Sequence, residues 1–129
     1  MPPLPENATE RERQCFEAYP RVGTVEAVSR SFDSYALFSQ CCGAPVFCGE
    51  MGCAAIAVDT HQRAVWYRLI AALLDERQIP RASWDYYGMF GLFKIGLRVP
   101  GAWKRPSFPE DLEPEIVEAL GLTLPGSEG

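Results

Sequence analysis

Two short apolar runs, separated by one long amphipathic stretch, most constrain what this chain can fold into. The first run spans residues 44–50 and is bounded by glycine, and the second spans residues 79–84. Apolar runs of this length are typical of strands buried in a parallel sheet. Between them, Asp59 and Gln62 have the spacing of a capping box, which predicts a helix to about Arg77. Strands that alternate with helices indicate βαβ units.

The rest of the sequence adds a helix on each side of this unit. Thr24 is expected to cap a helix that runs to about Gln40, and Pro114 to open a final helix over residues 115–120. Two strands close neither a barrel nor a doubly wound sheet, and a parallel sheet needs both faces covered. The chain is therefore expected to be part of a larger α/β fold. The central helix is expected to bury an apolar stripe of Val65, Trp66, Leu69, Ile70, Leu73 and Leu74.

Composition and charge exclude several classes of protein. The 129 residues fit one domain of ordinary size, and the formal net charge is -5. An acidic chain without a Lys/Arg cluster is not typical of a nucleic-acid binder. The apolar stretches are short and interrupted by charge, so we expect no membrane span. The first residues lack the basic and apolar regions of a signal peptide, which leaves the compartment unknown.

The five cysteines are odd in number and two of them are adjacent, which is not the pattern of a disulfide framework. A zinc site would require Cys41, Cys42, Cys48 and Cys53 to converge, although structural zinc sites prefer a tighter ligand spacing. We instead expect reduced thiols buried in a core, with no metal and no cofactor. A small redox or metal protein is a further interpretation, and it predicts bound zinc or a reactive thiol.

Glu50 is the first candidate for chemistry. It is expected at the C-terminal end of the first strand, which is the edge where parallel α/β folds carry their active sites. An ionisable carboxylate is costly to bury there without a function or a partner. Gly49 and Gly52 allow the backbone to approach a ligand closely. The structural alternative is an ion pair between Glu50 and a basic residue such as Arg81.

An aromatic segment begins at the end of the second strand. Residues 84–93 contain Trp84 and four further aromatic side chains. Because neighbouring parallel strands end at the same edge, Trp84 and Glu50 are expected to lie within about 10 Å of each other. An indole beside a carboxylate suits a sugar, since the ring stacks on apolar sugar faces while the carboxylate acts at the anomeric centre. The alternative is that most of the other aromatic residues pack a loop.

Two motifs at the C-terminal ends of these strands resemble those of one enzyme family. The run Phe47-Cys-Gly-Glu-Met-Gly52 is similar to the strand-seven motif of glycoside hydrolase family 5, the cellulase-like family, with methionine in place of the usual phenylalanine. Trp84 matches the tryptophan that ends strand eight. The run Met89-Phe-Gly-Leu-Phe93 is similar to the segment that follows it in the family. The similarity covers about residues 31–122.

The resemblance implies an α/β fold, namely a partial (β/α)₈ TIM barrel with about strands seven and eight and their flanking helices. Residues 24–122 would form the C-terminal part of the catalytic barrel, after a loop or frayed N-terminal segment over residues 1–23 and before a tail over residues 123–129. The implied activity is retaining hydrolysis of β-linked polysaccharide or oligosaccharide, as in cellulases and mannanases, by an O-glycosyl hydrolase. Relatives are usually secreted.

The resemblance also implies roles for three residues. Glu50 matches the catalytic nucleophile and Trp84 the tryptophan that stacks on the substrate. Tyr19, just before Pro20, is placed at a strand-six tyrosine that orients the nucleophile. The expected partner is a carbohydrate substrate, with no nucleic acid and no membrane. The missing part of the barrel, or a second copy of the chain, is a further expected partner.

One catalytic group has no counterpart in the sequence. Retaining hydrolysis needs a second carboxyl group about 5 Å from the first, to protonate the leaving oxygen. In the family this group belongs to an Asn-Glu motif after strand four, but the only asparagine here, Asn7, precedes Ala8. Glu76, Glu110 and Glu113 fall on a helix tail or a loop. The sequence therefore predicts either the nucleophile half of an enzyme or a non-catalytic truncated remnant with at most weak glycan binding.

Overall fold

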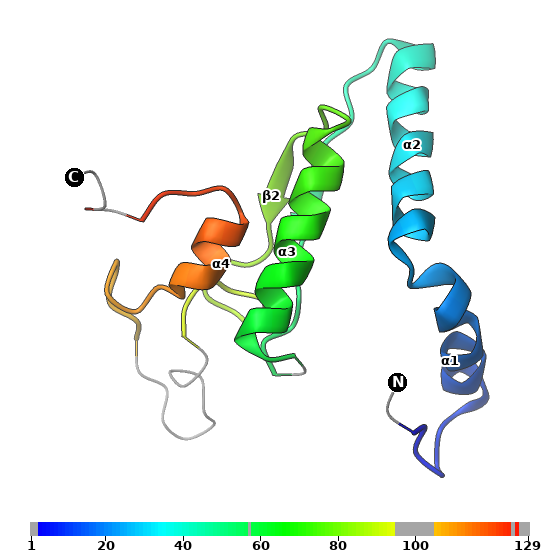
Figure 1. Ribbon diagram of the computed structural model, residues 1–129, viewed down its shortest axis with the longest axis horizontal. Coiled ribbons are helices and arrows are strands. Elements are labelled where there is room, and N and C mark those ends of the chain that lie inside the picture. The colour runs from blue at the N-terminus through cyan, green and yellow to red at the C-terminus, as the bar shows by residue number, and fades with distance from the viewer. Residues whose placement is uncertain (1–2, 57, 95–104, 125, 127–129) are drawn as a thin grey trace. The chain divides into compact units, whose positions relative to one another are not determined.

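The computed structural model describes residues 3–56, 58–94, 105–124 and 126, which belong to two compact units. The first unit comprises Met1–Ala44 and the second Pro45–Gly129. The described residues form four helices and two strands in the order α1, α2, β1, α3, β2, α4 (Figure 1).

Helix α1 (Glu10–Val22) occupies most of the segment 1–23, so the loop predicted there is wrong. Thr9 and Glu12 form a capping box, in which the Glu12 carboxylate accepts hydrogen bonds from the Thr9 hydroxyl at 2.7 Å and the Thr9 N–H at 2.6 Å. These bonds lower the pKa of Glu12. Pro20 lies near the end of α1, where its missing N–H costs the helix only one internal hydrogen bond. The capping box therefore outweighs the prolines that favour a loop.

Helix α2 (Val25–Cys42) confirms the helix predicted from Thr24. The Thr24 side chain accepts a hydrogen bond from the Ala27 N–H at 3.2 Å, and Gly43 ends the helix in the left-handed conformation at φ 63°. None of its residues is buried. Local capping thus defines this helix, while its apolar side chains at Val25, Tyr35, Leu37 and Phe38 are exposed.

The second unit is built on a parallel pair of strands, as the sequence predicts. Strands β1 (Cys48–Met51) and β2 (Arg81–Ser83) pair in parallel, and helix α3 (Thr60–Asp75) joins them and runs alongside β2 (Figure 1). The Cys48 N–H donates to the Pro80 carbonyl at 2.8 Å, just before the paired residues of β2. Both strands are shorter than the apolar runs that predict them.

Helix α3 begins as predicted but buries a different face. The Asp59 side chain caps it by accepting from the Gln62 N–H at 3.0 Å. The predicted stripe is correct for Ile70, Leu73 and Leu74 only, because Val65 is 49% exposed and Trp66 and Leu69 are half-buried. The buried face instead includes the polar side chains of Arg63 and Tyr67 together with Ala64 and Ala71.

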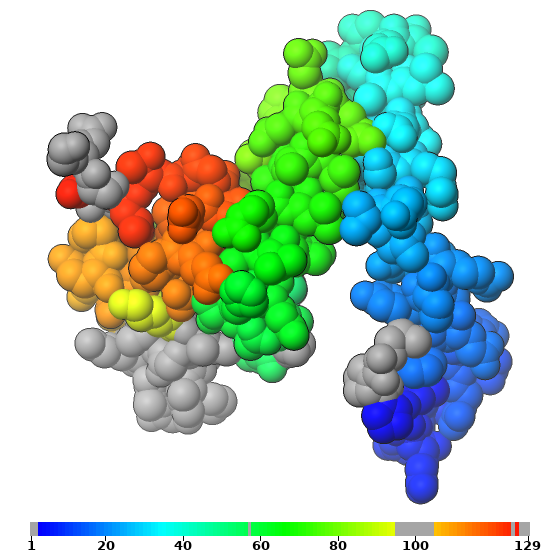
Figure 2. Space-filling model, in the orientation of Figure 1, coloured from blue at the N-terminus to red at the C-terminus, as the bar shows by residue number. Residues whose placement is uncertain are grey.

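Helix α4 (Pro114–Ala119) confirms the predicted final helix and packs against α3. Figure 2 shows the atoms of α3 (green) and α4 (orange) in direct contact. A small core cluster of Phe93, Leu112 and Val117 anchors the segment before α4, and Phe93 also forms an antiparallel bridge with Leu112. Of the predicted loop over residues 94–109, residues 95–104 lie outside the described residues.

The cysteines are free thiols, but the expectation that they are buried in a core is wrong. Cys15, Cys41 and Cys42 are exposed, and Cys48 and Cys53 are partly buried. Burial raises the pKa of the Cys53 thiol, against the opposing charge of Arg63. In the described ranges, no group of three or more His, Cys, Asp or Glu side chains is placed to hold a metal ion. No helix there is long and apolar enough to cross a membrane.

Candidate functional site

One face of the two-stranded sheet is covered by helices. Cys48 pairs with Arg81 and Met51 pairs with Ser83, and paired residues of adjacent strands point to the same face. Arg81 on this face donates a hydrogen bond to Asp75 at the end of α3. Met51 is only 5% exposed. The opposite face of the sheet is therefore the one turned away from α3.

A bulge in β1 determines where Glu50 lies. β1 has one residue more between its paired positions than β2 has between Arg81 and Ser83, and the register shifts between Cys48 and Met51. Such a bulge re-aims side chains and is frequent beside active sites. The burial pattern of β1 agrees with this, because its two central residues are exposed while Met51 is buried. Glu50, the second of those two, thus lies away from the helix-covered face.

Trp84 follows directly on the neighbouring strand. Its backbone N–H donates to the Met51 carbonyl at 2.8 Å, which joins the carboxyl ends of β1 and β2. Continuing the alternation of β2 places Trp84 on the face opposite Ser83, and its side chain is 52% exposed. The structure thus brings Glu50 and Trp84 to the same edge. Their expected separation of about 10 Å stays a prediction from strand spacing.

Among the residues that the structure describes, the Glu50 carboxylate forms no ion pair. Arg81, the partner considered from the sequence, donates to Asp75 and to the Leu120 carbonyl. Within the described ranges no ion pair includes Glu50, whose residue is exposed. No ion pair among the described residues therefore explains why this position carries a charge. The exposed carboxylate is accessible from solvent.

Gly52 is required by the close approach of the two chain segments. A Cβ atom at this position would lie 2.2 Å from the Trp84 carbonyl oxygen and 3.0 Å from the Phe90 Cβ. A further glycine, Gly88, donates its N–H to the Asp85 Oδ1 at 2.6 Å in the turn after Trp84. The Trp84–Asp85 peptide bond is cis. Gly52, the second glycine of the Gly-Glu-Met-Gly run, thus has a direct steric role at the candidate site.

Two buried side chains of α3, which the sequence analysis missed, tie together the loops that follow the strands. Arg63 is 1% exposed, and it donates through Nε to the Cys53 carbonyl at 3.1 Å and through Nη2 to the Gly91 carbonyl at 3.0 Å. Tyr67, one turn later, donates to the Phe90 carbonyl at 3.0 Å and accepts from the Cys53 N–H at 3.2 Å. These bonds hold the loop after β1 against the segment after β2. The only signal in the sequence is the spacing of two polar residues within an apolar helix face.

Tyr67→Phe is expected to lower the free energy of unfolding by about 1–3 kcal/mol, because it leaves the partly buried Phe90 carbonyl and Cys53 N–H without their partner. Urea unfolding followed by circular dichroism measures this loss. Tyr35→Phe is the matched control, since Tyr35 on α2 is 53% exposed. An equal loss in both variants would contradict the role of the Tyr67 hydroxyl.

The other residues considered for the site lie elsewhere. Tyr19 is in α1 of the first unit and is 54% exposed, whereas the resemblance expects a tyrosine at the end of a strand. Its role in substrate binding stays a prediction. Glu76 caps the C-terminal end of α3, which leads into the start of β2 and so to the sheet edge opposite Glu50. Glu113 is the N-cap residue of α4, and Glu110 lies in the turn before it.

Comparison with known proteins finds similarity among solved structures. No family model and no curated protein matches the sequence. A hyperthermophilic endo-β-1,4-glucanase in complex with substrate matches 75% of the chain with a TM-score of 0.56 and 26% identity. Thermotoga maritima Cel5A in complex with cellobiose matches 89% of the chain with a TM-score of 0.59 and 15% identity. The cellulose synthase subunit Z of Clostridioides difficile matches 91% with a TM-score of 0.58 and 17% identity.

The matches cover only part of each larger protein. The chain spans 27% of the endo-β-1,4-glucanase, 33% of Cel5A and 31% of the cellulose synthase subunit. At 15–17% identity the last two show the fold alone. The chain therefore has a glycoside hydrolase-like fold and is similar to about a third of a cellulase.

Proposed function

We propose that this chain carries the nucleophile half of a retaining glycoside hydrolase that acts on β-linked polysaccharide or oligosaccharide, in the manner of family 5 cellulases and mannanases. The observation that supports the proposal is the position of Glu50 and Trp84 at the carboxyl ends of two adjacent parallel strands. Such edges hold the active sites of parallel α/β folds. Solved Cel5A structures with cellobiose and with mannotriose support a carbohydrate ligand.

The two residues have distinct roles in this proposal. The Glu50 carboxylate attacks the anomeric carbon and forms a covalent glycosyl-enzyme, while the glycosidic bond breaks and its oxygen leaves with a proton from a second carboxyl group. Water then hydrolyses the intermediate, and the same second group accepts the proton of that water. Trp84 offers an exposed indole face on which a sugar ring stacks.

The second carboxyl group is proposed to come from the remainder of a (β/α)₈ barrel, in which β1 and β2 would be strands seven and eight. The partial coverage of the similar structures, 27–33% of their length, agrees with this. The same observation favours the alternative function, a non-catalytic remnant with at most weak glycan binding. The two proposals differ in whether the site works once the rest of the barrel is present.

A chimera in which this chain replaces the matching segment of the endo-β-1,4-glucanase is expected to hydrolyse a β-glucan, because the host supplies the acid/base group. The isolated chain is expected to show no turnover of a β-glucan or an aryl β-glycoside. Reducing-sugar release measures both activities, and circular dichroism shows whether the chimera folds. A folded but inactive chimera would favour the non-catalytic remnant, and turnover by the isolated chain would contradict the half-site.

A further inference from the structure

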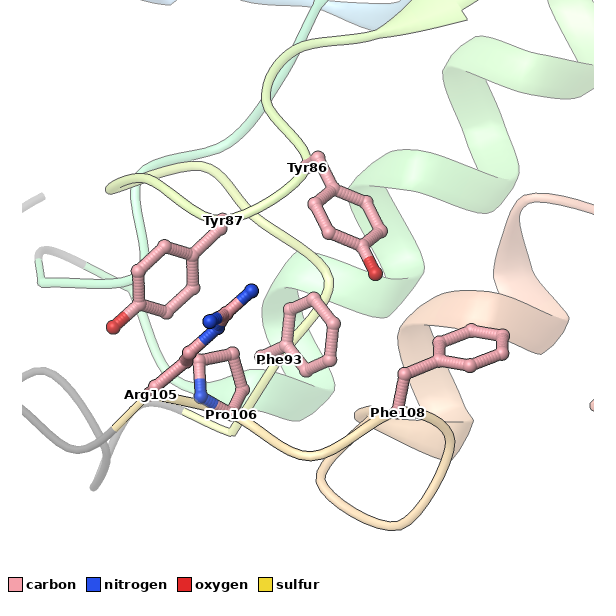
Figure 3. A pocket seen from close by; sticks show the side chains of 6 residues that line it. All are labelled: Tyr86, Tyr87, Phe93, Arg105, Pro106 and Phe108. Carbon is pink, nitrogen blue, oxygen red and sulfur yellow. The ribbon is translucent and has the colours of Figure 1, made fainter.

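A pocket of about 610 Å³ lies beside the segment that follows β2. Tyr86, Tyr87 and Phe93 from the segment after β2, and Arg105, Pro106 and Phe108 from the segment before α4, line it (Figure 3). Phe93 is 1% exposed, and the rings of Tyr86 and Tyr87 meet it edge-on at centroid distances of 5.1 and 6.1 Å. Phe93 is therefore a buried apolar ring at the base of the pocket, in edge-to-face contact with the two tyrosine rings. The volume is within the usual range of small-ligand pockets, about 300–1,000 Å³.

Hydrogen bonds fix parts of the two segments that line the pocket. The Leu92 N–H donates to the Tyr86 carbonyl at 3.2 Å, which fixes the turn that carries the tyrosines. Asp111 joins the segment before α4 to Lys94, which follows this turn. Its Oδ2 accepts from the Ser107 N–H at 2.8 Å, and its carbonyl accepts from the Lys94 N–H at 3.1 Å. The parts fixed in this way need no ordering when a ligand binds, which lowers the entropic cost of binding.

Arg105 gives the pocket its charge. It is the only charged residue among the described residues that line the pocket, and its side chain extends between Tyr87 and Phe93 in Figure 3. Within residues 3–56, 58–94, 105–124 and 126, no carboxylate forms an ion pair with it. A guanidinium binds a carboxylate through two parallel hydrogen bonds. The chain as a whole has a net charge of -5, but a cation in this pocket favours a ligand with an anionic group at the position of Arg105.

We propose that this pocket binds a sugar ring that bears a carboxylate, a hexuronate unit of an acidic glycan. The aromatic walls fit the apolar faces of a pyranose ring, and the tyrosine hydroxyls are suited to its hydroxyl groups. Arg105 then pairs with the carboxylate. The site uses neither Glu50 nor Trp84, so it does not depend on the glycosidase proposal. It adds acidic glycans to the neutral glucans and mannans considered above.

Titration calorimetry of the full chain with methyl β-glucuronide and methyl β-glucoside tests the proposal. The glucuronide is expected to bind at least about 10-fold more tightly than the glucoside, which corresponds to one charge-assisted interaction. Arg105→Gln is expected to remove this preference. Arg105→Lys, which keeps the charge but loses the paired geometry, is expected to retain part of it. Arg11→Gln on α1 is the matched control for loss of a positive charge and is expected to change nothing.

Two further measurements test the ring and the independence of the site. Phe108→Ala removes an apolar side chain that lines the pocket and is expected to weaken the binding of the glucuronide. Acetate alone is expected to bind far more weakly than the glucuronide. Glu50→Gln is expected to leave glucuronide binding unchanged, so inactivity of the chimera does not bear on this result. Equal binding of glucuronide and glucoside, equal binding of acetate and glucuronide, or no effect of Arg105→Gln would each overturn the proposal.

Discussion

Glu50→Gln is expected to abolish turnover in a barrel completed around this chain and to leave the fold intact. Glutamine keeps the shape of the side chain but has no nucleophilic charge, so the glycosyl-enzyme cannot form. Loss of a catalytic nucleophile lowers kcat by several orders of magnitude, and we expect at least about 10³-fold here. Because Glu50 is exposed and forms no ion pair within the described ranges, the substitution breaks no ion pair there.

The glucanase chimera is the protein in which to measure this effect. Kinetics on an aryl β-cellobioside give kcat, and mass spectrometry after reaction with a 2-deoxy-2-fluoro glycoside identifies the carboxylate that becomes glycosylated. The expected adduct lies on the peptide that contains Glu50. Glu110→Gln is the control for removal of a carboxylate from the same unit, and it should retain activity. An adduct on Glu110 or Glu113, or full activity of Glu50→Gln, would overturn the assignment of the nucleophile.

The elements of the fold follow from the sequence wherever a local signal determines them. Thr24 and Gly43 bound α2, and Asp59 begins α3, because caps act through bonds to residues only a few positions away. The capping box of Thr9 and Glu12 is equally local, but the predicted loop over residues 1–23 did not include it. The error at α1 was therefore a local signal in the sequence that was missed.

The buried face of α3 could not be predicted in the same way. Periodicity favours the most apolar stripe, but the observed face turns Arg63 and Tyr67 inward, where they satisfy backbone groups of two distant loops. Hydrogen bonds between segments 10 to 28 residues apart leave no periodic trace in a sequence. A buried polar side chain with several partners is stable, and it shifts the helix face accordingly.

The candidate site was predictable in its position but not in its detail. Glu50 and Trp84 were expected at one edge because parallel strands end together, and the observed pairing brings them there. The extra residue in β1 was not expected, since a bulge depends on the register against the neighbouring strand. Gly52 was expected to allow close approach to a ligand, whereas the structure shows close approach to the Trp84 carbonyl.

Gly52→Ala is expected to lower the free energy of unfolding by about 1–3 kcal/mol, the usual cost of overpacking. The added methyl group would lie 2.2 Å from the Trp84 carbonyl oxygen, a backbone atom that cannot rotate aside. The two loops must therefore separate, and Trp84 must move relative to Glu50. In the active chimera a displacement of about 1 Å at a substrate-positioning residue would lower kcat/KM by about 10²-fold. Urea unfolding and steady-state kinetics measure the two effects.

Gly49→Ala, within β1 and three residues before Gly52, provides the matched control. Its added methyl group would meet the Phe47 ring at 3.6 Å, an ordinary contact, so no backbone needs to move. The substitution also restricts the unfolded chain, and we expect stability to change by less than about 1 kcal/mol or to rise. Equal losses in the two variants would contradict a specific role for Gly52, because any side chain added to residues 49–52 would then destabilise the fold. A loss confined to Gly52→Ala, with kcat/KM falling in parallel, would show that this glycine holds Trp84 in register with Glu50.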